Sequence, residues 1–262
     1  MKRGEVGSQD RWITLLVDVS DALDTALTRL SRAAAKGRTD ARFFSIFVLQ
    51  AGQDIRAIAS LYKQNLKEPA QILVRAVIEC RLNFDLFFLR FLREPTDTMR
   101  LMLDAMMLEK MKQMESVNFR GLDLIPGAPT PDDLRQRERE IKARRSPSEV
   151  KALRKHGFSQ MTVEQRAREM HHSDMYNMVY RNFSRNVHGS DYAECLSREL
   201  ELNTVPHAVY TMERDKVSFS TAAFCATGIL DLTVRFFRFP MLRRVTSLRK
   251  QANKLQRANS IT

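Results

Sequence analysis

The chain has 262 residues, of which 44% are hydrophobic and 28% charged, the ordinary balance of a folded protein with a sizeable core. It holds only 9 glycines and 8 prolines, and this scarcity of turn-forming residues argues against an all-β or doubly wound fold and favours helices. The formal net charge of +12 favours a polyanionic partner, most often nucleic acid and less often a membrane surface.

Apolar residues at helical spacing predict four helices in the first half of the chain. Gly37 supplies a stop for the first of them. The third is apolar around most of its circumference, so we expect it at the centre of the fold. The expected ranges are 10–36, 40–64, 68–94 and 97–118.

A loop rich in proline and glycine, residues 121–134, is the clearest break in the chain. The following segment, 132–172, is predicted to form short helices that make a basic inserted arm. Between residues 132 and 169 the chain holds eleven Lys or Arg and seven Asp or Glu. This pattern leaves open both a solvated helical face laced with ion pairs and a nucleic-acid-binding arm.

Two further main helices are expected, at 173–188, where Gly189 is the stop, and at 215–238. The last residues, 241–262, carry six positive side chains and no acidic one, and are predicted to form a surface helix or a basic tail. We therefore predict an all-α bundle of about six main helices, in which residues 1–240 form a single domain.

The cysteines and the N-terminus bear on location and cofactors. Cys80, Cys195 and Cys225 are far apart and match neither a disulfide framework nor a metal-ligand spacing. No apolar signal region follows the N-terminus, and no uncharged run approaches the roughly 20 residues that span a bilayer. We expect a cytoplasmic protein with reduced thiols, with no metal, no cofactor and no membrane partner.

The stretch MVYRNFSRNVHGSDY, residues 178–192, holds the main candidate site. A helical wheel at roughly 100° per residue divides this helix into an apolar and a polar band. The apolar band, predicted to be buried, contains Tyr176, Val179, Tyr180, Phe183 and Val187. The polar band contains Asn177, Arg181, Ser184, Arg185 and His188.

The polar band suits metal-independent cleavage of RNA, in which the 2′-hydroxyl attacks the adjacent 3′-phosphate. His188 would give or take a proton near neutral pH, and neighbouring arginines would keep a neutral fraction of it available. An arginine fork binds phosphate oxygens and stabilises the negative charge that develops on the phosphorane. The structural alternative is a histidine favoured by the helix dipole beside solvated arginines.

A resemblance to a known superfamily favours the chemical interpretation. Arg181 and Asn182, followed by five residues and then His188, resemble the Arg-x(4–6)-His motif of the HEPN superfamily, in which a polar residue follows the arginine. The resemblance implies a helical bundle with metal-independent ribonuclease activity. It also implies a homodimer, because two copies of the motif meet across the dimer interface in that superfamily.

A second resemblance covers more of the chain. Arg75-Ala-Val-Ile-Glu79 and the stretch Ser-Arg-Asn-Val-His-Gly-Ser at 184–190 are similar to the motifs of a bacterial all-helical family labelled a domain of unknown function. These motifs anchor roughly residues 40–240, with the segment 132–169 and the tail outside.

Arg75 and Glu79 are four residues apart on the most hydrophobic helix, where an ion pair needs polar neighbours. One hypothesis is that Glu79 approaches His188 or Arg181 and orients it. A structural pair that pins two helices together is the equally open alternative.

The leading hypothesis is an endoribonuclease of the toxin or phage-defence type, with RNA as substrate and a protein partner encoded in the same operon. His188 would be the general base or acid and Arg181 the phosphate ligand, supported by Arg75, Glu79, Asn182, Ser184 and Arg185. A non-catalytic nucleic-acid-binding module and a helical partner or regulatory protein are the other classes. In the binding module, the contacts would come from cations of the arm and the tail: Arg144, Arg145, Arg243, Arg244, Arg249 and Lys250.

Overall fold

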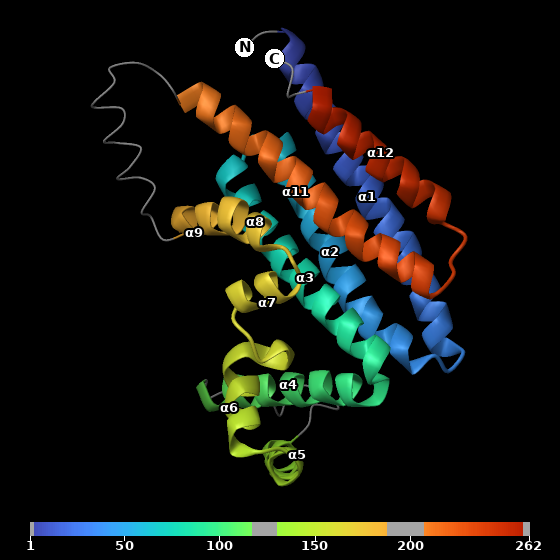
Figure 1. The fold of residues 1–262 in the computed structure, drawn as a ribbon, viewed down its shortest axis with the longest axis vertical. Coiled ribbons are helices and arrows are strands. Elements are labelled where there is room, and N and C mark those ends of the chain that lie inside the picture. Colours follow the sequence, from blue (N-terminus) through green and yellow to red (C-terminus); the bar gives the residue numbers. More distant parts are fainter. Residues whose placement is uncertain (1–2, 117–129, 188–206, 259–262) are drawn as a thin grey trace. The chain divides into compact units, whose positions relative to one another are not determined.

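Helices make up nearly all of the described chain (Figure 1). The computed structural model describes residues 3–116, 130–187 and 207–258. Within these ranges there is no strand, which confirms the all-α class. The six long helices are α1 (Arg3–Ala35), α2 (Thr39–Lys63), α3 (Lys67–Arg93), α4 (Pro95–Ser116), α11 (His207–Phe236) and α12 (Leu242–Ala258).

The shorter elements lie between α4 and α11. They are α5 (Pro131–Arg144), α6 (Pro147–His156), the 3₁₀ turn η2 (Gly157–Ser159), α7 (Val163–Glu169), α8 (Ser173–Met175), the π turn η3 (Tyr176–Tyr180) and α9 (Arg181–Val187). Three of them begin with a capping box, in which Thr130, Ser146 and Thr162 cap α5, α6 and α7. The caps and the proline after two of them fix where these short helices start.

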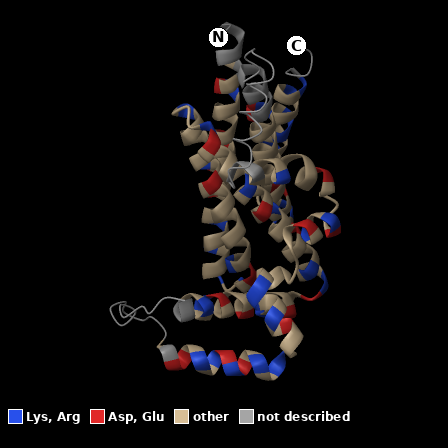
Figure 2. Ribbon diagram, turned by 90° about the vertical axis from the view of Figure 1, so that its left-hand side faces the viewer, with Lys and Arg blue, Asp and Glu red and all other residues tan. Residues whose placement is uncertain are grey.

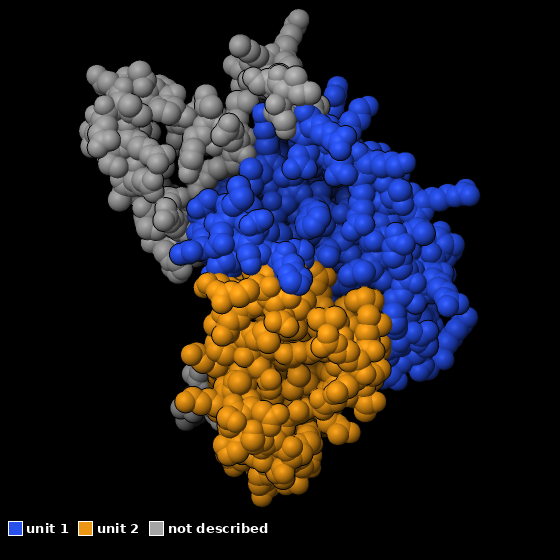
Figure 3. All heavy atoms as spheres, viewed as in Figure 1, with its two compact units in different colours: residues 1–84, 171–262 blue, residues 85–170 orange. Residues whose placement is uncertain are grey.

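The chain divides into two compact units, residues 1–84 with 171–262 and residues 85–170 (Figure 3). We expected one domain over 1–240 with an arm inserted at 132–172. The second unit instead begins inside α3 and includes α4. Its apolar cluster explains the larger extent, because α4 supplies half of the cluster and α5 and α6 the rest. The cluster consists of Leu101, Ala105, Leu108, Ile141, Val150 and Leu153.

Stacked aromatic rings fill the core of the first unit. The Trp12 ring lies parallel to that of Phe219 at 6.0 Å between centroids, and Tyr62 packs on the same Phe219 at 4.3 Å. Phe44 of α2 stacks on Phe236 of α11 at 5.1 Å. These contacts join α1, α2 and α11 into one core.

Helix α12 is a surface helix that contributes to this core. Met241, Val245 and Leu248 are buried against the first unit, where α12 contacts α1 and α11. Of the two expectations for the tail, the described part therefore forms a helix.

Helix α11 contains a long apolar stretch. Its stretch Asp215–Phe236 is long and apolar enough to cross a membrane, but 72% of its most apolar window is buried inside the protein. A charged side chain also lies against it, because a Cβ atom at Gly228 would stand 1.1 Å from Nη1 of Arg81. Burial of this kind is typical of the core helix of a soluble protein.

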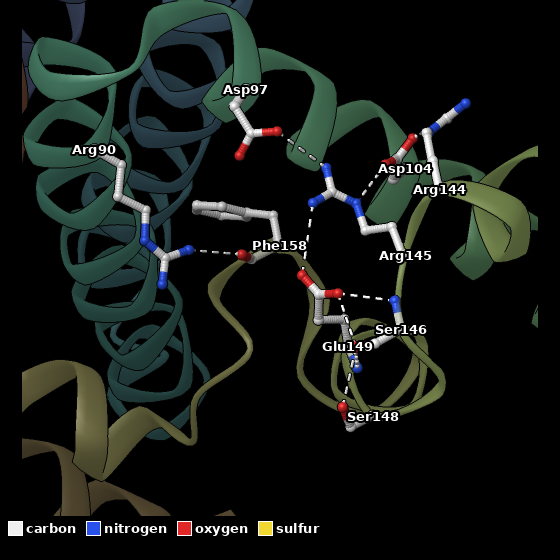
Figure 4. A network of polar contacts seen from close by, with 9 residues as sticks. All are labelled: Arg90, Asp97, Asp104, Arg144, Arg145, Ser146, Ser148, Glu149 and Phe158. Atoms are coloured by element: carbon white, nitrogen blue, oxygen red, sulfur yellow. Dashed lines mark hydrogen bonds and ion pairs between the residues drawn. The ribbon is translucent and has the colours of Figure 1, made fainter.

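An ion network holds the second unit together (Figure 4). Asp104 of α4 is 2% exposed and accepts hydrogen bonds from Arg144 at 2.5 Å and from Arg145 at 2.9 Å. Arg145 also pairs with Asp97 and Glu149 at longer distances, 3.5 and 3.9 Å. Burial lowers the pKa of Arg145, but the hydrogen bond to Asp104 and the negative charges of the three carboxylates together outweigh it, so the pKa is raised overall.

Helix α5 itself carries interspersed basic and acidic residues (Figure 2). Lys142 and Arg154 both contact Glu138, at 2.8 and 2.6 Å. This pattern favours the ion-paired face over the nucleic-acid-binding arm, the two interpretations that the sequence left open.

Candidate functional site

The segment that carries the candidate site contains a π turn. In η3 the backbone N–H of Arg181 donates to the carbonyl of Tyr176, five residues earlier, where an α-helix would bond four residues back. Such single π turns inside helices are frequent at functional sites. The turn adds one residue, so the side chains after it are rotated by roughly 100° relative to an uninterrupted helix.

The expected apolar band is buried in most of its described residues. Val179, Tyr180 and Phe183 are buried, as the helical wheel predicted, whereas Tyr176 is only half-buried. The side chain of Val187 lies outside the described residues.

Tyr180 connects the π turn to helix α3. Its hydroxyl donates to Oε1 of Glu79 at 2.7 Å and accepts from Nη2 of Arg75 at 3.1 Å. The Arg75 guanidinium also lies over the Tyr180 ring, 4.7 Å from its centroid, and its nearest approach to Glu79 is 4.0 Å. Burial raises the pKa of Tyr180, and the bond to Glu79 adds to the effect, so the phenol keeps its proton and remains a donor.

The Arg75–Glu79 pair therefore contacts the helix predicted at 173–188. The contact is made by Tyr180, which the helical wheel had assigned to the core. The hypothesis that Glu79 orients Arg181 or His188 finds no such bond among the described side chains, where the partner of Glu79 is Tyr180. This arrangement is compatible with the alternative that the pair pins two helices together.

An open pocket lies beside this network. It has a volume of about 560 Å³, within the usual range of ligand sites. Its lining comes from the π turn and the start of α9: Tyr176, Asn177, Tyr180, Arg181, Asn182 and Ser184.

The structure brings three of the predicted site residues to this pocket. Arg181 is exposed at the pocket wall. Asn182 donates to the carbonyl of Met178, and Ser184 to that of Tyr180, each at 2.7 Å, so both side chains are anchored to the preceding turn. His188 lies outside the described residues, as does the side chain of Arg185.

The predicted nucleic-acid contacts fall into two groups. Arg144 and Arg145 belong to the Asp104 network, and Arg249 donates to Asp231 at 3.0 Å. Arg243, Arg244 and Lys250 are exposed on α12. Two of these predicted contacts, Arg243 and Lys250, lie in one stripe on the outward face of α12, within roughly 60° around the helix axis. Two further cations, which were not among the predicted contacts, lie in the same stripe. The α12 stripe consists of Arg243, Lys250, Lys254 and Arg257.

Sequence reasoning missed the two tyrosines as parts of the site. Both follow the apolar pattern, which does not distinguish the half-buried Tyr176 from the buried Tyr180. Among the described side chains, no group of three or more His, Cys, Asp or Glu is arranged to hold a metal ion.

Replacing Tyr180 by phenylalanine tests the network. We expect a loss of about 1.5 kcal/mol in the free energy of unfolding, the low end for hydrogen bonds to charged groups, because Glu79 is 37% exposed and water can replace the hydroxyl. Urea unfolding followed by fluorescence of Trp12, the single tryptophan, measures this in the first unit. Tyr176→Phe, which removes a hydroxyl outside the network, is the control, and an equal loss in both variants would contradict the assignment.

Comparison with known proteins supports the resemblance to a family labelled a domain of unknown function. The sequence profile of a family of unknown function, DUF5677, matches residues 42–200, more than half of the chain, and the chain belongs to this family. The matched range includes the segment 132–169, which the motifs alone had left outside. No curated protein and no solved structure matches the chain significantly.

Proposed function

We propose that this protein is a metal-independent endoribonuclease related to the HEPN superfamily, of the kind found in toxin and phage-defence systems, acting as a homodimer in the cytoplasm. The observation that supports this best is the exposed Arg181 at the wall of an open, polar pocket, seven residues before His188 in the sequence. An arginine in such a place binds a phosphate bidentately, and a histidine near it can move the proton of a 2′-hydroxyl.

In the proposed reaction His188 accepts the proton of the 2′-hydroxyl while that oxygen attacks the adjacent phosphorus. The bond from phosphorus to the 5′-oxygen breaks, and the 5′-oxygen takes up a proton. The products are a 2′,3′-cyclic phosphate and a 5′-hydroxyl end. Arg181 stabilises the extra negative charge on the phosphoryl oxygens in the transition state. Arg185 and Ser184 would support it on the same segment, and the Arg75–Glu79–Tyr180 network would hold that segment in place.

The test is incubation of the purified full chain with single-stranded RNA in excess chelator. We expect cleavage with 2′,3′-cyclic phosphate ends by the wild type, and loss of cleavage in His188→Ala purified in the same way. A substrate with a 2′-deoxy sugar at the cleaved position should bind and stay intact. Equal inactivity of wild type and His188→Ala at high protein concentration would refute the nuclease.

A second candidate is a nucleic-acid-binding module without catalysis, and the α12 stripe favours it. Four exposed cations on one face of a helix with no acidic residue suit contact with a phosphate backbone. RNA binding that is lost when the α12 stripe is replaced by alanines, with no cleavage by the wild type, would establish this candidate instead.

A further inference from the structure

Two tyrosine rings lie stacked at the pocket. The rings of Tyr176 and Tyr180 are 5.3 Å apart between centroids with an angle of 20° between their planes. The Tyr180 hydroxyl is hydrogen-bonded to Glu79 and Arg75. The Arg75 guanidinium also lies over the Tyr180 ring. Tyr176 therefore rests on a side chain that has little freedom to move, so stacking on it costs little further ordering.

Exposure differs between the two rings. Tyr180 is 8% exposed and belongs to the core, whereas Tyr176 is half-buried and lines the pocket. A large aromatic side chain at the wall of an open pocket, supported by a second ring, offers a flat apolar surface of the size of a nucleobase.

The other pocket residues add polar groups of the right kind. Asn177 and Asn182 both line the pocket and are exposed. Each amide offers donors and an acceptor, although Asn182 already uses one donor on the Met178 carbonyl. Unpaired bases are recognised by stacking on aromatic rings and by hydrogen bonds to their edges, and Arg181 beside them supplies a cation for the adjoining phosphate.

We propose that Tyr176 is the stacking platform for one unpaired nucleobase of single-stranded RNA, with the Asn177 and Asn182 amides at the edge of the base. This inference rests on the proposed function and deepens it, because it restricts the substrate to unpaired RNA. A base inside a duplex is stacked on both faces and is not available to Tyr176, so duplex RNA binds more weakly.

The test uses a single-stranded oligoribonucleotide that carries the fluorescent base 2-aminopurine, whose emission falls when it stacks. The protein is the full chain with His188→Ala, so that the oligonucleotide stays intact. We expect quenching on binding, retained in Tyr176→Phe. In Tyr176→Leu we expect the quenching to disappear and the affinity to fall about 5- to 150-fold, the range for loss of one stacked base. Met178→Ala is the matched control, because Met178 lies in the same π turn but is 70% exposed and does not line the pocket.

A thermodynamic cycle separates stacking from a change in folding. Removing the base from the oligonucleotide should weaken binding to the Tyr176 protein and should have little further effect in Tyr176→Leu. Unchanged affinity and quenching in Tyr176→Leu, or equal binding of a duplex, would overturn the platform.

The same data distinguish the two proposals. Binding that depends on Tyr176 without cleavage by the wild type would refute the nuclease and keep the platform. Cleavage by the wild type without dependence on Tyr176 would do the reverse.

Discussion

Replacing Arg181 by alanine should lower the rate of RNA cleavage by about 100- to 1,000-fold, the usual cost of removing one donor that stabilises a developing oxyanion. The reason is the position of Arg181, which is exposed at the wall of the pocket next to the Tyr180 network. Arg181→Lys should recover only part of the rate, because lysine keeps the charge but not the two-pronged geometry of the guanidinium. Single-turnover cleavage in chelator measures the effect.

Two further experiments test which arginine acts and whether the site is shared between two protomers. Arg185→Ala shows which of the two arginines on this segment acts, and we expect the smaller loss there. Mixing Arg181→Ala with His188→Ala tests the homodimer, because the mixed dimer contains one intact site only if the arginine of one protomer acts with the histidine of the other. A rate in Arg181→Ala equal to that of the wild type would remove Arg181 from the mechanism.

Replacing Asp104 by alanine should destabilise the second unit by about 3 kcal/mol, the lower end of the range for breaking a buried ion pair. The loss leaves Arg145, whose side chain is 10% exposed, without its nearest carboxylate. We choose the lower end because Asp97 and Glu149 remain, although both are about half exposed and farther away. Trp12 belongs to the other unit, so the measurement is hydrogen exchange in α4, α5 and α6 of the full chain.

Arg144→Ala is the matched control for Asp104→Ala. Arg144 bonds the same carboxylate, but its side chain is 41% exposed, so its loss should cost about 1 kcal/mol or less. Equal effects of the two substitutions would mean that burial does not govern the network. The expected ranking would also confirm that Arg145 serves the fold, and it would weaken its assignment as a nucleic-acid contact.

Apolar periodicity was enough to predict most of the long helices. The ends of α2, α3 and α4 follow the expected ranges closely, because proline and polar residues mark them. The start of α1 was missed, since Gly4 and Gly7 lower helix propensity there, and α11 begins earlier than expected, at His207.

The division into two units could not be predicted in the same way. Its first boundary falls at residue 84, inside the continuous helix α3, where no glycine or proline signals a break. The ion network that centres on Asp104 joins residues 40 positions apart, and such pairings leave no local pattern in a sequence.

Three of the residues that the sequence singled out line the pocket, but their geometry was not predicted. Arg181, Asn182 and Ser184 do gather at one pocket, yet the wheel assumed a uniform rotation per residue and placed Tyr176 and Tyr180 together in the core. The hydrogen bond between Tyr180 and Glu79 joins residues 101 positions apart, and a single sequence does not reveal it.

The π turn lets this segment hold one residue more than an α-helical turn would. An α-helix would need one residue fewer between Tyr176 and Arg181. Deleting a residue there, even the exposed Met178, would return the turn to α geometry and leave Arg181 and Ser184 on the same side of the helix, whereas forcing all the present residues into α geometry would rotate both by roughly 100° around the axis. Relatives with one residue fewer in this turn should therefore keep the counterparts of Arg181 and Ser184 on the same side of a regular α-helix.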